Sequence, residues 1–188
     1  MNREVIWEAE GGIGQEHLTL SDRNGVIIAD SFAIVKPGDQ PIRVRYQILC
    51  DANWVVRGVG LTTELAHGSP TVVEIRSDGR GHWTNSDGSP LPHLDGCVDV
   101  DISTTPFTNT LPIRRLELQP GQSETIHVTY INVETLAVEP WEQRYTGIEP
   151  GAVRYESDTG GYFRRDLEID EDGLVRNYPG LFTRVWAS

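Results

Sequence analysis

The side chains that could do chemistry in this chain are concentrated in residues 96–116, GCVDVDISTTPFTNTLPIRRL. Asp99 and Asp101 stand two residues apart, and hydroxyl and amide side chains follow them. Arg114 and Arg115 close the segment. Residues two apart on a β-strand share a face about 7 Å from each other, so both carboxylates would point to one site. Such a pair could transfer protons, bind a metal ion or accept hydrogen bonds from a ligand.

These acids also have a structural explanation, in which they are solvated or paired with Arg114 or Arg115. If Asp101 pairs with an arginine in a partly buried site, Asp101→Asn should cost roughly 3 kcal/mol. An exposed pair would lose less than about 1 kcal/mol. Glycosidases place their two carboxylic acids on opposite sides of a sugar, so two acids on one strand are weak evidence for hydrolysis.

Sequence motifs of the common cofactor and metal enzymes are absent. The five histidines lack the HExxH and HxxxH spacings of zinc sites, and GxSxG, GxGxxG and GxxxxGK[ST] do not occur. Residues 170–173, DEDG, lack the later ligands of a calcium loop and are typical of a turn. We therefore expect no cofactor, no metal and no established catalytic residue.

Composition narrows the class of partner. The 188 residues fit one domain over 1–188, and the formal net charge of -12 disfavours nucleic acid and anionic lipid surfaces. The longest apolar run, residues 26–35, is broken by Asp30 and is far shorter than the ~20 residues of a membrane helix. The first residues contain no apolar signal segment, so we expect a cytoplasmic protein with Cys50 and Cys97 reduced.

Short alternating segments predict a mostly β fold. Residues 42–49, 71–76, 125–133 and 166–169 alternate apolar and polar side chains between turn-forming residues. Strand, Asn-Gly or Asp-Gly turn and return strand recur in residues 18–27, 73–79 and 167–175, which predicts hairpins in a meandering sheet. Strand residues should outnumber helical residues by at least two to one.

Helical segments should be few. Thr105 before Pro106 is a suitable N-cap and first helical residue, and Pro112 keeps that helix short or bent. Residues 139–145, EPWEQRY, are a second brief candidate, because Trp141 and Tyr145 would stack at i and i+4.

Aromatic side chains with polar tips suit ligands that have both sugar and hydrocarbon faces. We expect a cavity over the short helix, lined on one side by aromatic residues such as Trp54 and Tyr155. Core packing is the alternative explanation for any one of these rings.

Several segments together resemble the bacterial family named "putative glycolipid-binding", which has a spiral β-roll fold. They are YQILCDANW at 46–54, the segment 96–116, QRY at 143–145, VRY at 153–155, DEDGLV at 170–175 and YPGLF at 178–182. The similarity covers nearly the whole chain and is most specific in 96–116. The resemblance implies a long antiparallel sheet rolled around one short central helix, a cytoplasmic bacterial protein and a ligand role that is only inferred for the family. It supplies no catalytic residue.

We therefore expect non-enzymatic binding of a glycolipid or similar amphipathic small molecule. The expected ligand-binding residues are Trp54, Asp99, Asp101, Asn109, Arg114, Arg115 and Tyr155. A small hydrolase or isomerase using Asp99 and Asp101, or a protein-interaction module, are the alternatives. The sequence names no specific ligand and leaves open whether the chain forms a homodimer.

Overall fold

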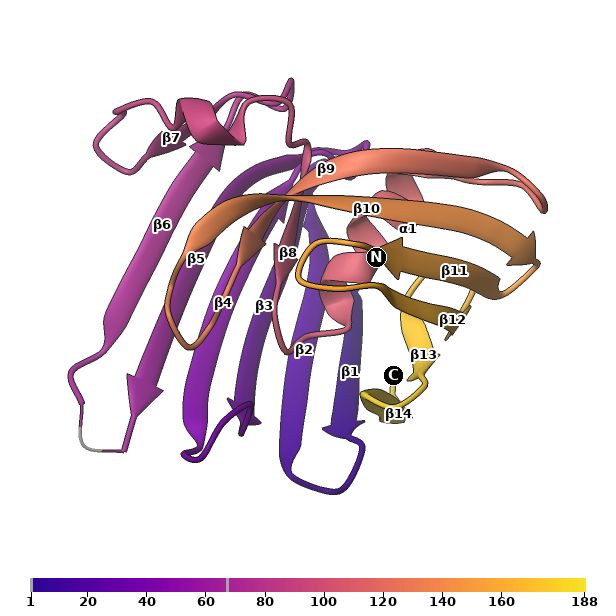
Figure 1. The fold of residues 1–188 in the computed structure, drawn as a ribbon, viewed down its shortest axis with the longest axis horizontal. Coiled ribbons are helices and arrows are strands. Elements are labelled where there is room, and N and C mark those ends of the chain that lie inside the picture. Colours follow the sequence, from indigo (N-terminus) through magenta and orange to yellow (C-terminus); the bar gives the residue numbers. More distant parts are fainter. Residues whose placement is uncertain (1, 67) are drawn as a thin grey trace.

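The chain forms one long sheet of fourteen strands rolled around a short α-helix (Figure 1). The computed structural model describes residues 2–66 and 68–188. The strands of the first half are β1 Asn2–Ala9, β2 Gly14–Arg23, β3 Val26–Val35, β4 Ile42–Cys50, β5 Val56–Leu65, β6 Thr71–Ser77 and β7 Trp83–Asn85. Those of the second half are β8 Asp99–Ile102, β9 Ser123–Ile131, β10 Val138–Glu149, β11 Ala152–Ser157, β12 Phe163–Ile169, β13 Val175–Tyr178 and β14 Phe182–Ala187. The helical segments are the 3₁₀ turns η1 Pro92–Leu94 and η2 Phe107–Asn109, and the α-helix α1 Thr110–Leu116.

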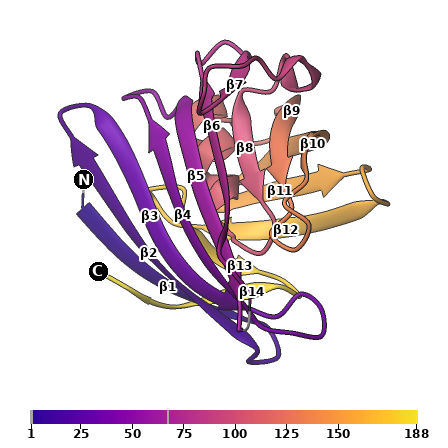
Figure 2. The same cartoon turned by 90° about the vertical axis from the view of Figure 1, so that its left-hand side faces the viewer.

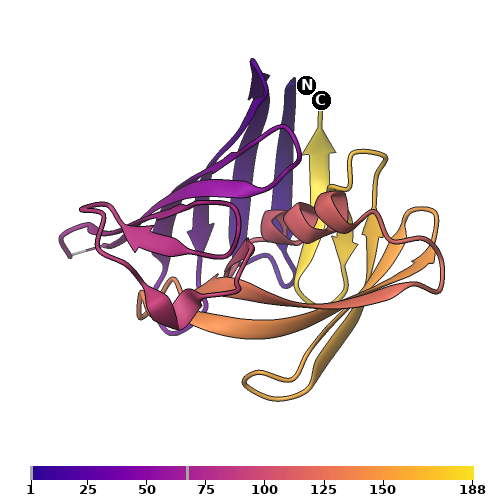
Figure 3. The ribbon, with the colours of Figure 1, turned by 90° about the horizontal axis from the view of Figure 1, so that it is seen from above.

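The order of the strands joins the two halves at the chain ends. Across the sheet the order is β7 to β1, then β14 to β8, so β1 pairs with β14 in the middle. Neighbours are antiparallel except β8 and β9, which are parallel. Seen from above, α1 lies in the curve between the two halves (Figure 3), and the side view shows the N-terminal strands as one inclined layer (Figure 2). The predicted mostly β, rolled fold is confirmed.

The predicted hairpins are present, and their turn residues adopt the backbone conformations that such turns require. Asn24 and Gly25 between β2 and β3 both have positive φ, 58° and 82°, as a type I′ turn requires. Residues 170–173 form the predicted turn between β12 and β13, in which the Asp170 carboxylate accepts hydrogen bonds from the backbone N–H groups of Asp172 and Leu174. The charge of Asp170 is neutralised by Arg184, whose Nη1 lies 2.6 Å from the Asp170 Oδ2.

The helix predicted for residues 139–145 is wrong, because this segment lies in strand β10. Trp141, Gln143 and Tyr145 recur at period two as well as at i and i+4, and pairing with β9 over the whole length of the segment decides between the two. On the strand all three side chains share one face. Trp141 then stacks on Tyr130 of β9, with ring centroids 3.7 Å apart.

The other predicted helix is present and short. The Thr105 hydroxyl accepts a hydrogen bond from the Phe107 N–H at 3.1 Å, which caps the start of η2. Pro112 is the third residue of α1, where a backbone N–H would have no partner within the helix. The helix ends where Glu117 adopts φ 47°, with its N–H bonded to the Ile113 carbonyl.

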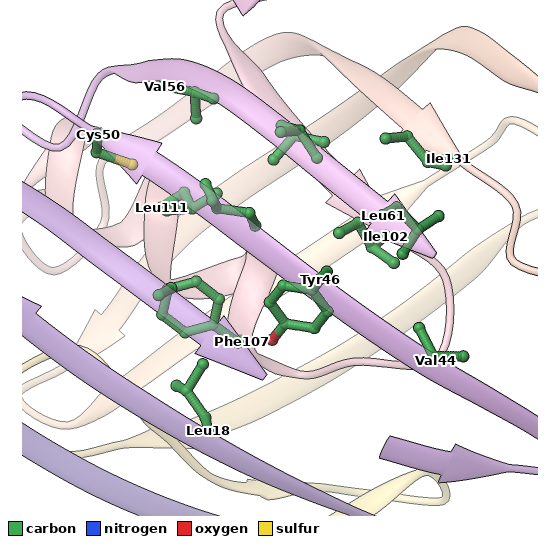
Figure 4. Packing of buried hydrophobic residues seen from close by; sticks show 14 of the residues in the cluster. Leu18, Val44, Tyr46, Cys50, Val56, Leu61, Ile102, Phe107, Leu111 and Ile131 are labelled. Carbon is green, nitrogen blue, oxygen red and sulfur yellow. The ribbon is translucent and has the colours of Figure 1, made fainter. Parts of the chain in front are cut away.

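The larger apolar core lies between α1 and the inner face of the N-terminal strands. Figure 4 shows Phe107 and Leu111 facing Tyr46 and Leu18 of this cluster. A smaller, tyrosine-rich cluster lies under β9 to β13; its buried members are Ile126, Val128, Tyr145, Val153, Tyr155, Leu167, Val175 and Tyr178. In the part of the chain that the structure covers, no helix is long and apolar enough to cross a membrane.

Gly147 of β10 should be intolerant of a side chain, since a Cβ there would lie 2.5 Å from the Gln119 carbonyl oxygen and 2.8 Å from that of Leu118. These carbonyls belong to the segment that leaves α1. We expect Gly147→Ala to lower the free energy of unfolding by roughly 1–3 kcal/mol in urea denaturation. Gly60→Ala is the matched control, because a Cβ at this other strand glycine meets nothing within 4 Å. Equal stabilities of the two variants would contradict the close packing at Gly147.

Candidate ligand-binding pocket

Asp99 and Asp101 share one face of β8 but bind different partners. Asp99 is fully buried, and the Arg115 guanidinium from the last turn of α1 holds it, with Nη2 at 2.6 Å from Oδ2 and Nε at 3.2 Å from both oxygens. Burial raises the pKa of Asp99, and the hydrogen bonds and charge of Arg115 oppose that rise. For Asp99, the ion-pair explanation is the correct one, and the pair ties α1 to the sheet.

Asp101 is held by neutral groups instead. The Thr108 hydroxyl donates to its Oδ1 at 2.9 Å, and the Gln143 amide donates to its Oδ2 at 2.6 Å. Burial raises the pKa of Asp101, while these two hydrogen bonds lower it. The alternative in which Asp101 pairs with Arg114 or Arg115 does not hold, because Arg115 binds Asp99, about 7 Å along the strand, and Arg114 lies over the Trp54 ring.

A chain of hydrogen bonds continues from Asp101 into the interior. The Gln143 Oε1 accepts from the Tyr145 hydroxyl at 3.2 Å, and that hydroxyl accepts from the Asn109 amide at 2.9 Å. Gln143, Tyr145 and Asn109 are all buried. The inner side of the Asp101 carboxylate is therefore fixed by a network of side chains from β10 and η2, none of them charged.

The outer side of Asp101 faces a pocket of about 460 Å³. Its lining comes from the end of β8 and the loop after it, from η2, and from strands β9 to β14 with two of the loops between them. The lining residues are Asp101, Ile102, Ser103, Thr104, Thr105, Asn109, Tyr130, Trp141, Tyr155, Ser157, Thr159, Gly160, Gly161, Tyr162, Phe163, Tyr178, Leu181 and Phe182. Tyr155 and Tyr178 also line the pocket, and burial and then the charge of Asp101 raise the pKa values of their hydroxyls. Tyr162, 68% exposed, lies at the rim.

The structure separates the residues that the sequence had grouped. Asp101, Asn109 and Tyr155 line this pocket. Arg114 instead lies over the Trp54 ring, 5.0 Å from its centroid, and borders a second hollow of about 400 Å³ beside Glu117 and Glu149.

Trp54, 5% exposed, packs in the larger core and is not among the residues lining the Asp101 pocket. Of the aromatic lining, the expected site residues included Tyr155 but not Tyr130, Trp141 or Phe163. The signal for Trp141 was its period-two spacing with Gln143 and Tyr145 on β10.

One buried acid was also missed. Glu16 of β2 is 1% exposed, and its Oε1 accepts hydrogen bonds from the hydroxyls of Tyr46 at 2.5 Å, Ser31 at 2.7 Å and Thr105 at 3.0 Å. Burial raises its pKa, which these hydrogen bonds oppose. Because Thr105 lines the pocket and caps η2, Glu16 fixes this edge of the site to the N-terminal strands. The sequence indicated that the Glu16 side chain points inward, because Glu16 stands two residues before Leu18 and so shares its face of β2.

Comparison with known proteins agrees with this architecture. The model of the family described as "Putative glycolipid-binding" matches residues 4–184. The chain belongs to this family. A crystal structure of a DUF1089 family protein from Pseudomonas aeruginosa is similar to the chain with a TM-score of 0.82 and 36% identity, over 92% of each chain. No curated protein matches. The resemblance inferred from the segments around residues 96–116 is thus confirmed.

Removing Arg115 should leave the buried Asp99 carboxylate without a cation. We expect Arg115→Met to cost about 3 kcal/mol near neutral pH. Without the arginine the folded-state pKa of Asp99 lies above its unfolded value, so the penalty appears as pH rises through the folded pKa and disappears below the unfolded one, about 3.9. Urea denaturation near pH 4 and near pH 7 measures this.

The control is Arg43→Met, which removes an exposed partner of Glu64 and should change stability little at either pH. A small loss in Arg115→Met would mean that the ion pair contributes little to stability, and a loss that does not shrink on acidification would mean that the unpaired Asp99 charge is not its cause.

Proposed function

We propose that the chain binds an amphipathic, glycolipid-like ligand in the Asp101 pocket and does not transform it. The observation that carries the proposal is a pocket with two kinds of surface. Its inner end has the Asp101 carboxylate and the Asn109 amide, and its walls have aromatic rings from the six strands β9 to β14. Membership of the family supports the same class of ligand.

Sugars match this combination of surfaces. A pyranose has hydroxyls around its edge and apolar C–H groups on its faces, so it can donate to a carboxylate while a ring packs on its face. The pocket volume of about 460 Å³ is within the range of small-molecule sites. Each Å² of apolar surface removed from water contributes about 25 cal/mol, while a few fixed polar groups set the orientation.

The layout favours entry of the sugar first. The polar groups of Asp101 and Asn109 are anchored in the protein interior, whereas Leu181 and Tyr162 are exposed at the outer part of the lining. A ligand placed with its sugar against Asp101 would leave its hydrocarbon chain near these outer apolar side chains. The reverse orientation would bury the chain against a carboxylate.

The geometry supports binding more than catalysis. Within the described residues that line the pocket, Asp101 is the single carboxylic acid, because Asp99 is occupied by Arg115. Hydrolysis of a glycoside by the common mechanisms uses two carboxyl groups across the bond. A concave pocket of this size also supports a small ligand over the flat surface expected of a protein-interaction module.

Other finer expectations remain part of this proposal. The continuous sheet supports a single domain over 1–188. Cys50 and Cys97 are both free and buried, which supports a reducing compartment such as the cytoplasm of a bacterium. Burial raises the pKa of the Cys50 thiol to about 12, so it is unreactive at neutral pH.

Octyl β-D-glucoside, titrated below its micelle concentration, should change the intrinsic tryptophan fluorescence saturably, because Trp141 lines the pocket. Trp141→Phe should remove most of the change. Trp186→Phe is the matched control, since Trp186 lies on β14 outside the lining and should leave the response intact. A response that survives Trp141→Phe, or no saturable response in the unmodified chain, would count against binding at this pocket.

A further inference from the structure

The wall of the Asp101 pocket contains one carboxylate and no cationic side chain among the described residues. Within the described lining residues there is no Lys, Arg or His, and Asp101 supplies the one ionisable acid group other than the tyrosines. The remaining polar groups are hydroxyls and the Asn109 amide. The hollow at the other end of α1 differs, because Arg114 lines it. The absence of a cation from its wall therefore distinguishes the Asp101 pocket from the hollow beside Arg114, in a protein whose formal net charge is already -12.

Asp101 also has unused hydrogen-bonding capacity. A carboxylate offers about four acceptor positions, and Thr108 and Gln143 occupy one on each oxygen. Both donors are buried, so they approach from the protein interior, and Asp101 itself lines the pocket. No cationic side chain of the described residues pairs with this carboxylate. A ligand that brings hydrogen-bond donors would therefore stabilise it, and two adjacent hydroxyls of a sugar can do so together.

We propose that the pocket selects glycolipids with an uncharged sugar head group and rejects anionic ones, and that Asp101 is the residue that sets this specificity. The inference rests on the proposed function and adds the class of head group. An anionic group placed beside Asp101 would lose its hydration and face a like charge, and the wall offers no cation in compensation. A neutral sugar avoids both costs and donates to the same oxygens.

Two probes that differ in one charge test the proposal. Octyl β-D-glucoside and octyl β-D-glucuronide share chain and ring, but the second carries a carboxylate in place of the hydroxymethyl group. Isothermal titration calorimetry at neutral pH and physiological ionic strength should show the glucuronide binding roughly tenfold or more weakly, because like charges a few Å apart repel strongly in a partly desolvated site. The two probes should be used below their micelle concentrations.

Three variants locate the cause. Asp101→Asn should weaken glucoside binding and reduce the difference between the two probes. Asp166→Asn is the matched control: it removes the same charge from an exposed, outward-facing position of β12, 51% exposed, and should leave the difference unchanged. Thr159→Lys adds a cation to the pocket wall in a turn and should improve binding of the glucuronide relative to the glucoside. This last variant keeps the test decisive if Asp101→Asn fails to fold.

The outcomes are distinct. Binding of the glucoside with much weaker binding of the glucuronide supports the inference. Equal binding of the two overturns it while leaving the proposed function intact. Binding of neither octyl glucoside nor glucuronide would remove the proposed function, and this inference with it.

Discussion

An open sheet that rolls up must cover its inner face, and here a helix of only seven residues, α1, contributes to that cover. A helix this short is not stable alone, so its position depends on tertiary contacts. Two buried carboxylates supply them. Glu16 binds Thr105 before the helix, and Asp99 binds Arg115 in its last turn. Between these two polar contacts, Phe107 and Leu111 pack in the larger apolar core (Figure 4).

The contacts of Glu16 with Thr105 and of Asp99 with Arg115 explain why polar groups are present in an otherwise apolar interior. Burying a carboxylate costs free energy that its partners recover only in part, so a hydrophobic replacement could be as stable. Such a replacement would not fix the rotation of α1 about its own axis. The 3₁₀ turn η2, which leads directly into α1, directs Thr108 toward Asp101 and Asn109 toward Tyr145, and so determines which atoms form the inner end of the pocket. The buried acids thus act on the site through the helix that they hold.

Features set by neighbouring residues could be predicted from the sequence, whereas features set by distant pairing could not. The Asn24-Gly25 turn and the Thr105 cap depend on a few adjacent residues, and both were predicted correctly. The assignment of 139–145 failed because its spacing fits a helix and a strand equally, and only pairing with β9 decides between them. The placement of Trp54 failed for the same reason. Nothing near it in sequence shows that Arg114 covers its ring.

Asp99 and Asp101 show most clearly how environment assigns roles within one segment. They are the same residue type on the same face of β8, and sequence reasoning treated them as a pair. Arg115 makes a bidentate contact with both oxygens of Asp99, which is fully buried. Asp101, two residues on, meets only neutral donors and remains half-buried at the pocket. A carboxylate without a cation still needs hydrogen-bond donors on its open side, and in this fold that side is where a ligand would bind.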